Sequence, residues 1–349
     1  MATIFEERVN RIQPILMTPL RRCGSHALRL RLSMNSAFYA PYPLHLVDFM
    51  PLLQYYGDLS DDNDYFRLVT DVIGFANASS VRWTELGFDP VEIFDALKDR
   101  HRSIHMITWY MLFKAGWAKN ARVVMDKSLD TVEWADQLME IFDDMLFLNV
   151  VRDPRAQVSS INRAIIHNFD TYLNAKLWVE AMNKGVALAE KYPDRVLTIR
   201  FEDLLSNQYD VIKEICQFMR IRFSEDMLDL TVSREAQSLA GRSDLWKHNY
   251  SGPIKANIDK FKKYLSMDEI ELIETMTGDL MDHFSYERIT EAKAVISEDQ
   301  EAAAIVRSEE QKVKAWAALK EKDPQDYIMR RFRANFLADL ESRLKAGDF

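Results

Sequence analysis

Four short apolar runs without polar alternation constrain the fold of this chain more than any other feature. They are QPILMT (13–18), ARVVMD (121–126), MLFLNVV (145–151) and RVLTIRF (195–201). Strands that are buried on both faces have such continuous apolar sequences, and the segments between these runs have helical spacing. The alternation predicts βαβ units, and therefore an α/β fold with a central parallel β-sheet flanked by helices. In such sheets, ligands bind beyond the carboxyl ends of the strands.

Two of the intervening segments have a clear apolar helical face, TVEWADQLMEIFDD (131–144) and YDVIKEICQFM (209–219). A third segment, ALRLRLSM (27–34), is ambiguous. Its strict alternation favours a strand, whereas its leucines and methionine also recur at the i, i+4 spacing of a helix. The Gly-Ser pair directly before it favours a helix start.

The composition changes after about Ile289. Residues 290–349 are rich in Ala, Glu and Lys, and PQDYIMRRFRANFLADLESRLKAG follows the first part of this segment. We expect one domain over 1–289 and a C-terminal helical extension over 290–349, formed by one or two helices. This extension suits packing or the formation of a homo-oligomer better than it suits chemistry.

Charge and cysteine content exclude several classes of protein. The formal net charge is −9, which argues against general nucleic-acid binding, although a local arginine cluster can still hold an anion. Two widely spaced cysteines, Cys23 and Cys216, make a poor disulfide framework and indicate a reducing compartment. No stretch approaches the roughly 20 apolar residues of a membrane span, and the N-terminus does not resemble a secretory signal. We expect a soluble, cytoplasmic protein.

The first apolar run leads into a basic turn, TPLRRCGSHALRLRL (18–32). Between a strand and a helix, such a turn can hold a phosphate through backbone N–H groups and the helix dipole. Gly24 allows the backbone to approach a ligand, Ser25 and His26 offer donors, and Arg22 supplies charge. A Walker A loop is excluded, because Pro19 stands where its first glycine belongs and Ser25 where its lysine belongs. On this evidence alone, an incidental basic turn remains an alternative.

A second stretch, FLNVVRDPRAQVSS (147–160), also runs from a predicted strand into a helix. Pro154 suits the first helical turn, and Ser160 follows Arg152 by about two helical turns. An arginine at a strand end and a serine on the adjoining helix can converge on one phosphate. A structural pair between Asp153 and an arginine is the alternative interpretation.

Taken in order, these segments resemble one family. RRCGSHAL resembles the 5′-phosphosulfate loop of sulfotransferases that use 3′-phosphoadenosine-5′-phosphosulfate (PAPS), and VVRDPRAQVSS resembles their 3′-phosphate motif. VVMDKS, RVLTIRFEDLLSNQYDVIKEICQFM and GRSDLWKHNYSGPI are similar to three further family segments. The resemblance covers roughly residues 12–289, and it is to the bacterial-type branch, which has a P-loop NTPase-like fold.

The resemblance implies an enzyme that moves a sulfuryl group from PAPS to a hydroxyl or amine of a small-molecule or carbohydrate acceptor. Such in-line transfer uses a general base, requires no metal and leaves adenosine 3′,5′-bisphosphate. The residues that the resemblance assigns to the 5′-phosphosulfate are Arg22, Cys23, Gly24, Ser25, His26 and Ala27. Arg152 and Ser160 would hold the 3′-phosphate, and the late loop adds two weaker candidates, Arg242 and Lys247.

The general base departs from the family pattern. Leu129 stands where cytosolic members have a histidine, and Tyr42 stands where other branches have a glutamate. His45, three residues after Tyr42, lies in a loop expected at the ligand end of the sheet. An imidazole with a pKa near neutrality suits a base, so we predict this role for His45.

Other side chains have predicted supporting roles or remain alternatives for the base. Arg22 and His26 would stabilise charge on the bridging oxygen, and Lys127 would hold bridging or substrate charge. The alternatives for the base are Asp130, His101 and His105. Two other functions also stay open, a small-molecule kinase with a degenerate phosphate loop and a non-catalytic sulfotransferase-like binding protein.

Overall fold

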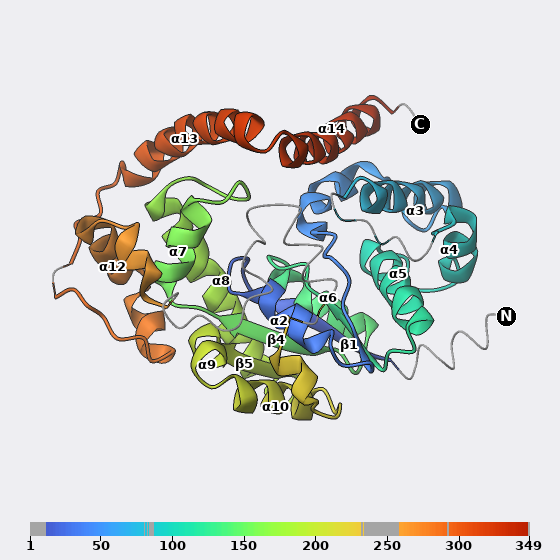
Figure 1. The fold of residues 1–349 in the computed structure, drawn as a ribbon. Coiled ribbons are helices and arrows are strands. Elements are labelled where there is room, and N and C mark those ends of the chain that lie inside the picture. Colours follow the sequence, from blue (N-terminus) through green and yellow to red (C-terminus); the bar gives the residue numbers. More distant parts are fainter. Residues whose placement is uncertain are drawn as a thin grey trace. The chain divides into compact units, whose positions relative to one another are not determined.

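A five-stranded parallel sheet forms the centre of the fold, with the strands in the order β2-β3-β1-β4-β5 (Figure 1). The computed structural model describes residues 12–79, 81, 83, 87–231, 233, 258–291 and 293–347. The strands are β1 (Gln13–Thr18), β2 (Phe38–Tyr39), β3 (Val123–Asp126), β4 (Leu146–Val151) and β5 (Val196–Arg200). In the register of β1 and β3, Gln13 is opposite Val123 and Leu16 is opposite Asp126. The predicted α/β fold and all four predicted strands are confirmed.

Helices account for most of the remaining described residues. The α-helices are α2 (Ser25–Leu32), α3 (Asp62–Asn77), α4 (Pro90–Leu97), α5 (Ile104–Ala118), α6 (Ala135–Ile141), α7 (Pro154–Asn162), α8 (Thr171–Lys191), α9 (Phe201–Ser206), α10 (Gln208–Phe218), α12 (Met267–His283), α13 (Gln300–Lys322) and α14 (Pro324–Ala346). Short 3₁₀ helices are η1 (Leu46–Asp48), η2 (Met50–Tyr55), η3 (Val132–Trp134), η4 (Glu225–Leu228) and η6 (Asp259–Lys263). The helical prediction for 209–219 is confirmed by α10, and the one for 131–144 by η3 together with α6.

The ambiguous segment 27–34 lies in helix α2 and the turn that follows it. Its alternation does not mark a strand, because apolar and charged residues are buried alike from Leu28 to Leu32. Leu28, Leu30 and Leu32 are buried, and so are Arg29 and Arg31 between them. Burial lowers the pKa of Arg31 to about 10, although the charge of Asp229 opposes the shift. A helical segment whose charged and apolar residues are both buried has no amphipathic pattern in its sequence.

The chain divides into two compact units. The first comprises 1–17, 32–147 and 325–349. Its helices α3, α4 and α5 pack together, and one apolar cluster in it includes Phe49, Tyr65, Phe75 and Leu340. The hydrophobic effect at these buried side chains holds the helices to one another.

The second unit comprises 18–31 and 148–324. Helix α8 packs against α7, α12 and α13. Trp178 of α8 is fully buried in an apolar cluster with Val151 and Tyr286. This packing fixes α7, the helix that carries Ser160.

The C-terminal segment forms two helices, as predicted. Residues up to Pro324 cluster with the second unit, whereas 325–349 cluster with the first. The domain boundary at 289/290 and the formation of a homo-oligomer through these helices stay predictions. Among the helices that the structure describes, none combines the length and apolarity of a membrane span.

Candidate active site

The loop between β1 and α2, residues 19–24, has a backbone shape that requires glycine at one position. Arg22 and Gly24 both have left-handed φ angles, 71° and 86°. A Cβ atom at Gly24 would overlap the ring of Phe201. Because only glycine combines this conformation with so close an approach, Gly24 fixes the path of the loop into the helix.

The residues that follow Gly24 begin α2. The first helical hydrogen bond runs from Leu28 N–H to the carbonyl of Gly24, at 3.2 Å, so the amides before Leu28 have no acceptor within the helix. Cys23 is fully buried and its thiol is free of a disulfide, and Ser25 is also buried. His26 and Ala27 are half-buried in the first helical turn. Cys23 can therefore offer a ligand its backbone but not its side chain.

The second motif begins where β4 ends and α7 starts. Pro154 is the first residue of α7, and the Asp153 carboxylate caps the helix by accepting from Arg155 N–H. Arg152 Nη1 donates to the carbonyl oxygen of Arg22 at 2.8 Å. Arg22 Nε in turn donates to Ser160 Oγ at 3.1 Å. The two sequence motifs, some 130 residues apart, therefore meet in the second unit.

Arg152 retains a donor suited to an anion. Its Nε is buried and has no hydrogen-bond acceptor among the residues that the structure describes. Burial lowers the pKa of Arg152, whereas the nearby charge of Glu202 opposes the shift. Its guanidinium also lies 5.1 Å from the centre of the Phe201 ring. A buried cationic donor of this kind is stabilised by a phosphate oxygen.

Glu202 anchors the turn behind Arg152. Its carboxylate accepts from Asp153 N–H at 3.1 Å and from the Tyr286 hydroxyl at 2.8 Å. Burial raises the pKa of Glu202, and the hydrogen bonds from Tyr286 and Asp153 oppose that rise. Because both oxygens of the Glu202 carboxylate accept hydrogen bonds from the protein, Glu202 holds the turn in place.

Sequence analysis missed two side chains that hold the loop. Gln157 of α7 donates to the carbonyl of Arg21 at 2.8 Å and accepts from Trp178 Nε1 at 3.1 Å. Asn149, in the middle of β4, accepts from Thr18 Oγ1 and donates to Thr198 Oγ1, both at 3.2 Å. Gln157 lies within the RDPRAQ stretch, and Asn149 is a polar residue inside an apolar strand. Those two signals could have identified them.

A buried ion network fixes the start of α7. Arg155 forms two hydrogen bonds to the Asp153 carboxylate, and its Nη1 lies 2.6 Å from Glu274 Oε1 of α12. The Arg155 and Glu274 side chains are only 6% and 3% exposed. Burial alone would raise the pKa of Glu274, but hydrogen bonds from Thr290, Ile289 and Arg155 outweigh it and lower the pKa. The structural pair between Asp153 and an arginine, the alternative interpretation of this motif, thus exists beside the contact that Arg152 makes with Arg22.

Replacing Glu274 by glutamine should lower the free energy of unfolding by about 3 kcal/mol, because Arg155 would then keep a buried charge with one partner fewer. Asp282→Asn on the same helix is the matched control. Its carboxylate is 66% exposed and pairs with Arg288 at the surface, so its loss should cost less than about 1 kcal/mol. Urea unfolding measures both, and equal losses would contradict the importance of the buried network.

His45 lies in the first unit, at the start of η1. It has a left-handed φ of 54°, and its backbone N–H donates to Ser128 Oγ at 3.2 Å. Ser128 N–H donates to the buried Asp126 carboxylate at the end of β3, at 2.8 Å. Lys127, between them, is 2% exposed. The turn after β3 therefore holds the His45 backbone, and Asp126 holds that turn.

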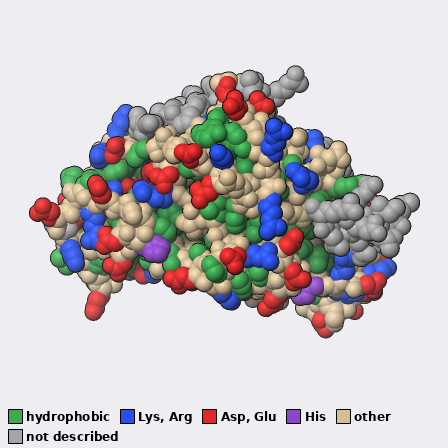
Figure 2. All heavy atoms as spheres, turned by 90° about the horizontal axis from the view of Figure 1, so that it is seen from below, with side chains coloured by type: hydrophobic (Ala, Val, Ile, Leu, Met, Phe, Trp, Pro, Cys, Tyr) green, Lys and Arg blue, Asp and Glu red, His purple; other side chains and the backbone are tan. Residues whose placement is uncertain are grey.

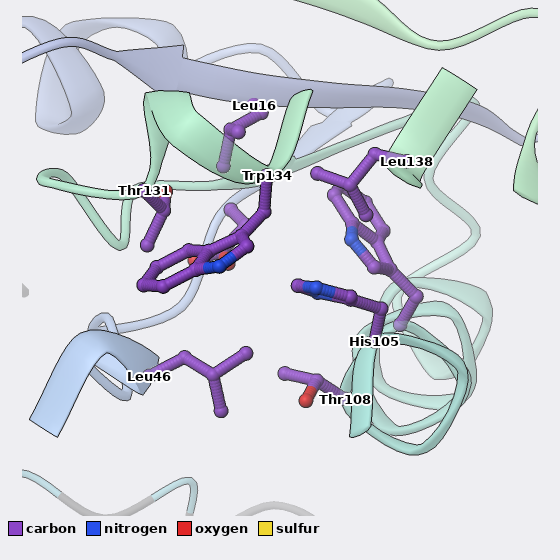
Figure 3. A pocket seen from close by; sticks show the side chains of 9 residues that line it. Leu16, Leu46, His105, Thr108, Thr131, Trp134 and Leu138 are labelled. Atoms are coloured by element: carbon purple, nitrogen blue, oxygen red, sulfur yellow. The ribbon is translucent and has the colours of Figure 1, made fainter. Parts of the chain in front are cut away.

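The alternatives for the base have different surroundings. His105 Nε2 lies 3.1 Å from Gln137 Oε1, and burial lowers the pKa of His105. It lines a small cavity with Asp126 and Trp134, and Figure 3 shows its ring between Trp134 and Thr108.

The other two alternatives for the base are His101, which is exposed, and Asp130, which has a left-handed φ of 72°.

The two predicted donor-site residues of the late loop, Arg242 and Lys247, lie outside the described residues. Within those residues, no three His, Cys, Asp or Glu side chains are grouped so that they could hold a metal ion. On the face shown in Figure 2, Lys and Arg side chains are interspersed with Asp and Glu.

Comparisons with known proteins identify a family and support the fold. A family model described as "Sulfotransferase family" matches residues 14–225. The chain is similar to the sulfotransferase domain from the Synechococcus PCC 7002 olefin synthase, with 20% identity, a TM-score of 0.55 and coverage of 79% of this chain and 94% of that one. It is also similar to the sulfotransferase domain from the curacin biosynthetic pathway, with 18% identity, a TM-score of 0.50 and coverage of 79% and 98%. No curated protein sequence matches.

Proposed function

Because this chain belongs to the sulfotransferase family, we propose that it transfers a sulfuryl group from PAPS to a hydroxyl or amine of a small-molecule or carbohydrate acceptor. The observation that carries the proposal is the meeting of the two motifs. Arg152 donates to the carbonyl of Arg22, and Arg22 donates to Ser160. One doubly phosphorylated nucleotide needs two such anion sites side by side.

The residues at this junction fit such a donor. The amides of the first turn of α2, with Ser25 and His26, suit the 5′ end, since a helix N-terminus attracts anions. The buried Nε of Arg152 and the hydroxyl of Ser160 suit the 3′-phosphate. Arg22 contacts Ser160, and its long side chain would serve either phosphate. Arg242 and Lys247 are proposed to complete the site from the late loop.

The bound donor would supply a sulfuryl group on a phosphate leaving group, whose S–O bond breaks as the acceptor oxygen or nitrogen bonds to sulfur. Arg22 and His26 would stabilise the charge that develops on the leaving oxygen. Arginine keeps its proton throughout, so Arg22 would act through charge and hydrogen bonds alone. The His45 imidazole would accept the proton of the acceptor, and Lys127 would hold substrate charge. The left-handed His45 backbone supports this role, because such strain clusters at functional sites.

The cysteines support a cytoplasmic location for this activity. Cys23 and Cys216 are both free of disulfides and both buried. Free thiols are typical of proteins in a reducing compartment.

Adenosine 3′,5′-bisphosphate should raise the melting temperature of the protein. At 100 to 1,000 times its Kd, it should add about 3 to 4 kcal/mol to the free energy of unfolding. Adenosine 5′-monophosphate, which lacks the 3′-phosphate, is the matched control and should stabilise the protein far less. Stabilisation by ATP and Mg²⁺ but not by the bisphosphate would overturn the proposal in favour of a kinase.

A further inference from the structure

We propose that helix α14 is a brace for the active site, and that Arg333 is a positioning residue for the segment 44–48, which carries His45. The inference rests on the proposed role of His45 as the base. It assigns a catalytic consequence to a helix outside the region 14–225 that the family model matches.

Arg333 binds this segment at several points. Its Nη2 donates to the carbonyl of Leu44 at 3.0 Å and to Asp48 Oδ2 at 2.8 Å, and it lies 3.4 Å from the carbonyl of His45. The guanidinium also lies 4.2 Å from the centre of the Phe75 ring. The Arg333 side chain is only 16% exposed. A single nitrogen, Nη2 of Arg333, thus contacts both ends of the segment.

The segment needs such support because His45 has an unfavourable backbone conformation. A left-handed non-glycine residue is strained and persists only where its surroundings impose it. Ser128 Oγ accepts the His45 N–H from one direction. On the carbonyl side, Asp48 N–H closes the η1 turn on His45 at 3.1 Å, and Arg333 holds the flanking groups. The amide and carbonyl of His45 are therefore both fixed.

Helix α14 is itself firmly docked within the first unit. Leu340 and Leu344 are buried in the same cluster as Phe49 and Phe75. Phe336, one turn after Arg333, packs against Gly74 of α3, where an added Cβ would lie 3.0 Å from the phenylalanine ring. By contrast, Arg343 forms an ion pair within the helix, with Asp339 at 3.1 Å. Arg333 therefore extends from a helix that buried contacts hold in place.

Amide hydrogen exchange on the full-length protein tests the brace. In Arg333→Ala, the amides of 44–49 should exchange roughly ten- to a hundred-fold faster, because charged hydrogen bonds to the segment are lost. Arg343→Ala removes the same charge from the same helix and should leave this segment unchanged. Arg333→Lys keeps a positive charge for Asp48 but carries it on a shorter side chain of different shape, so it should restore protection in part.

A second readout follows the imidazole itself. The side-chain NMR signal of His45, assigned through His45→Gln, should move in Arg333→Ala, recover in part in Arg333→Lys and stay in place in Arg343→Ala. Unchanged exchange and an unchanged His45 signal in Arg333→Ala would overturn the inference. Failure of the proposed function would be seen separately, as a wild-type protein that does not bind adenosine 3′,5′-bisphosphate. That measurement tests the donor site, to which Arg333 does not contribute.

Discussion

Replacing Arg152 by methionine should abolish the stabilisation that adenosine 3′,5′-bisphosphate gives the wild-type protein. Methionine keeps much of the apolar stem but removes the buried Nε and the bond from Nη1 to the carbonyl of Arg22. Losing one charged partner of a buried phosphate costs about 2–5 kcal/mol. We therefore expect Kd to rise by roughly 30-fold to several thousand-fold. Isothermal titration calorimetry measures this change directly.

Arg288→Met is the matched control for the change of charge. Arg288 lies in the same unit and pairs with the exposed Asp282. Its loss should change the Kd of the bisphosphate less than about twofold, since surface ion pairs contribute little. The melting temperature of each variant without ligand shows whether it folds. A folded Arg152→Met protein that binds the bisphosphate as wild type does would contradict the donor site.

β1, β3 and β4 were predictable from sequence because their burial leaves a continuous apolar run. β5 was also predicted, although it is an edge strand in which only Ile199 is buried. β2 was missed because Phe38–Tyr39 is two residues long, too short to form a pattern. The conformation of helix α2 remained ambiguous because its sequence alternates apolar and charged residues. Its arginines are buried together with its leucines, so tertiary packing, and not local periodicity, decided its conformation.

The candidate site was predictable where a motif is local. Gly24 was identified from its place in the basic turn between a strand and a helix, and Arg152 from its position at a strand end. The hydrogen bond between Arg22 and Ser160 joins residues 138 apart in sequence, and that between Arg333 and Leu44 spans 289. No local pattern encodes such contacts, because they depend on which elements the folded chain brings together. The roles of His45, His26 and Lys127 stay predictions for the same reason.

Replacing Gly24 by alanine should have the second large effect on the donor site. Alanine at this position would have a left-handed φ of 86°, and its methyl group would overlap Phe201. A left-handed conformation costs an alanine about 1–2 kcal/mol, and forced overlap in a packed site costs about 1–3 kcal/mol more. The loop must shift, and with it the carbonyl of Arg22 that Arg152 binds. We expect a lower melting temperature and weaker binding of the bisphosphate, by roughly tenfold or more.

The double variant Gly24→Ala with Phe201→Ala separates the two causes. Without the phenylalanine ring the overlap disappears, whereas the strain of the left-handed backbone remains. Because Phe201 also lies beside Arg152, the single Phe201→Ala variant supplies the baseline for the double variant. If overlap dominates, the added alanine should weaken binding much less in this background than in wild type. Gly87→Ala, where a Cβ meets nothing within 4 Å, should leave binding unchanged, and a Gly24→Ala protein that binds and melts like wild type would show that the loop tolerates a side chain there.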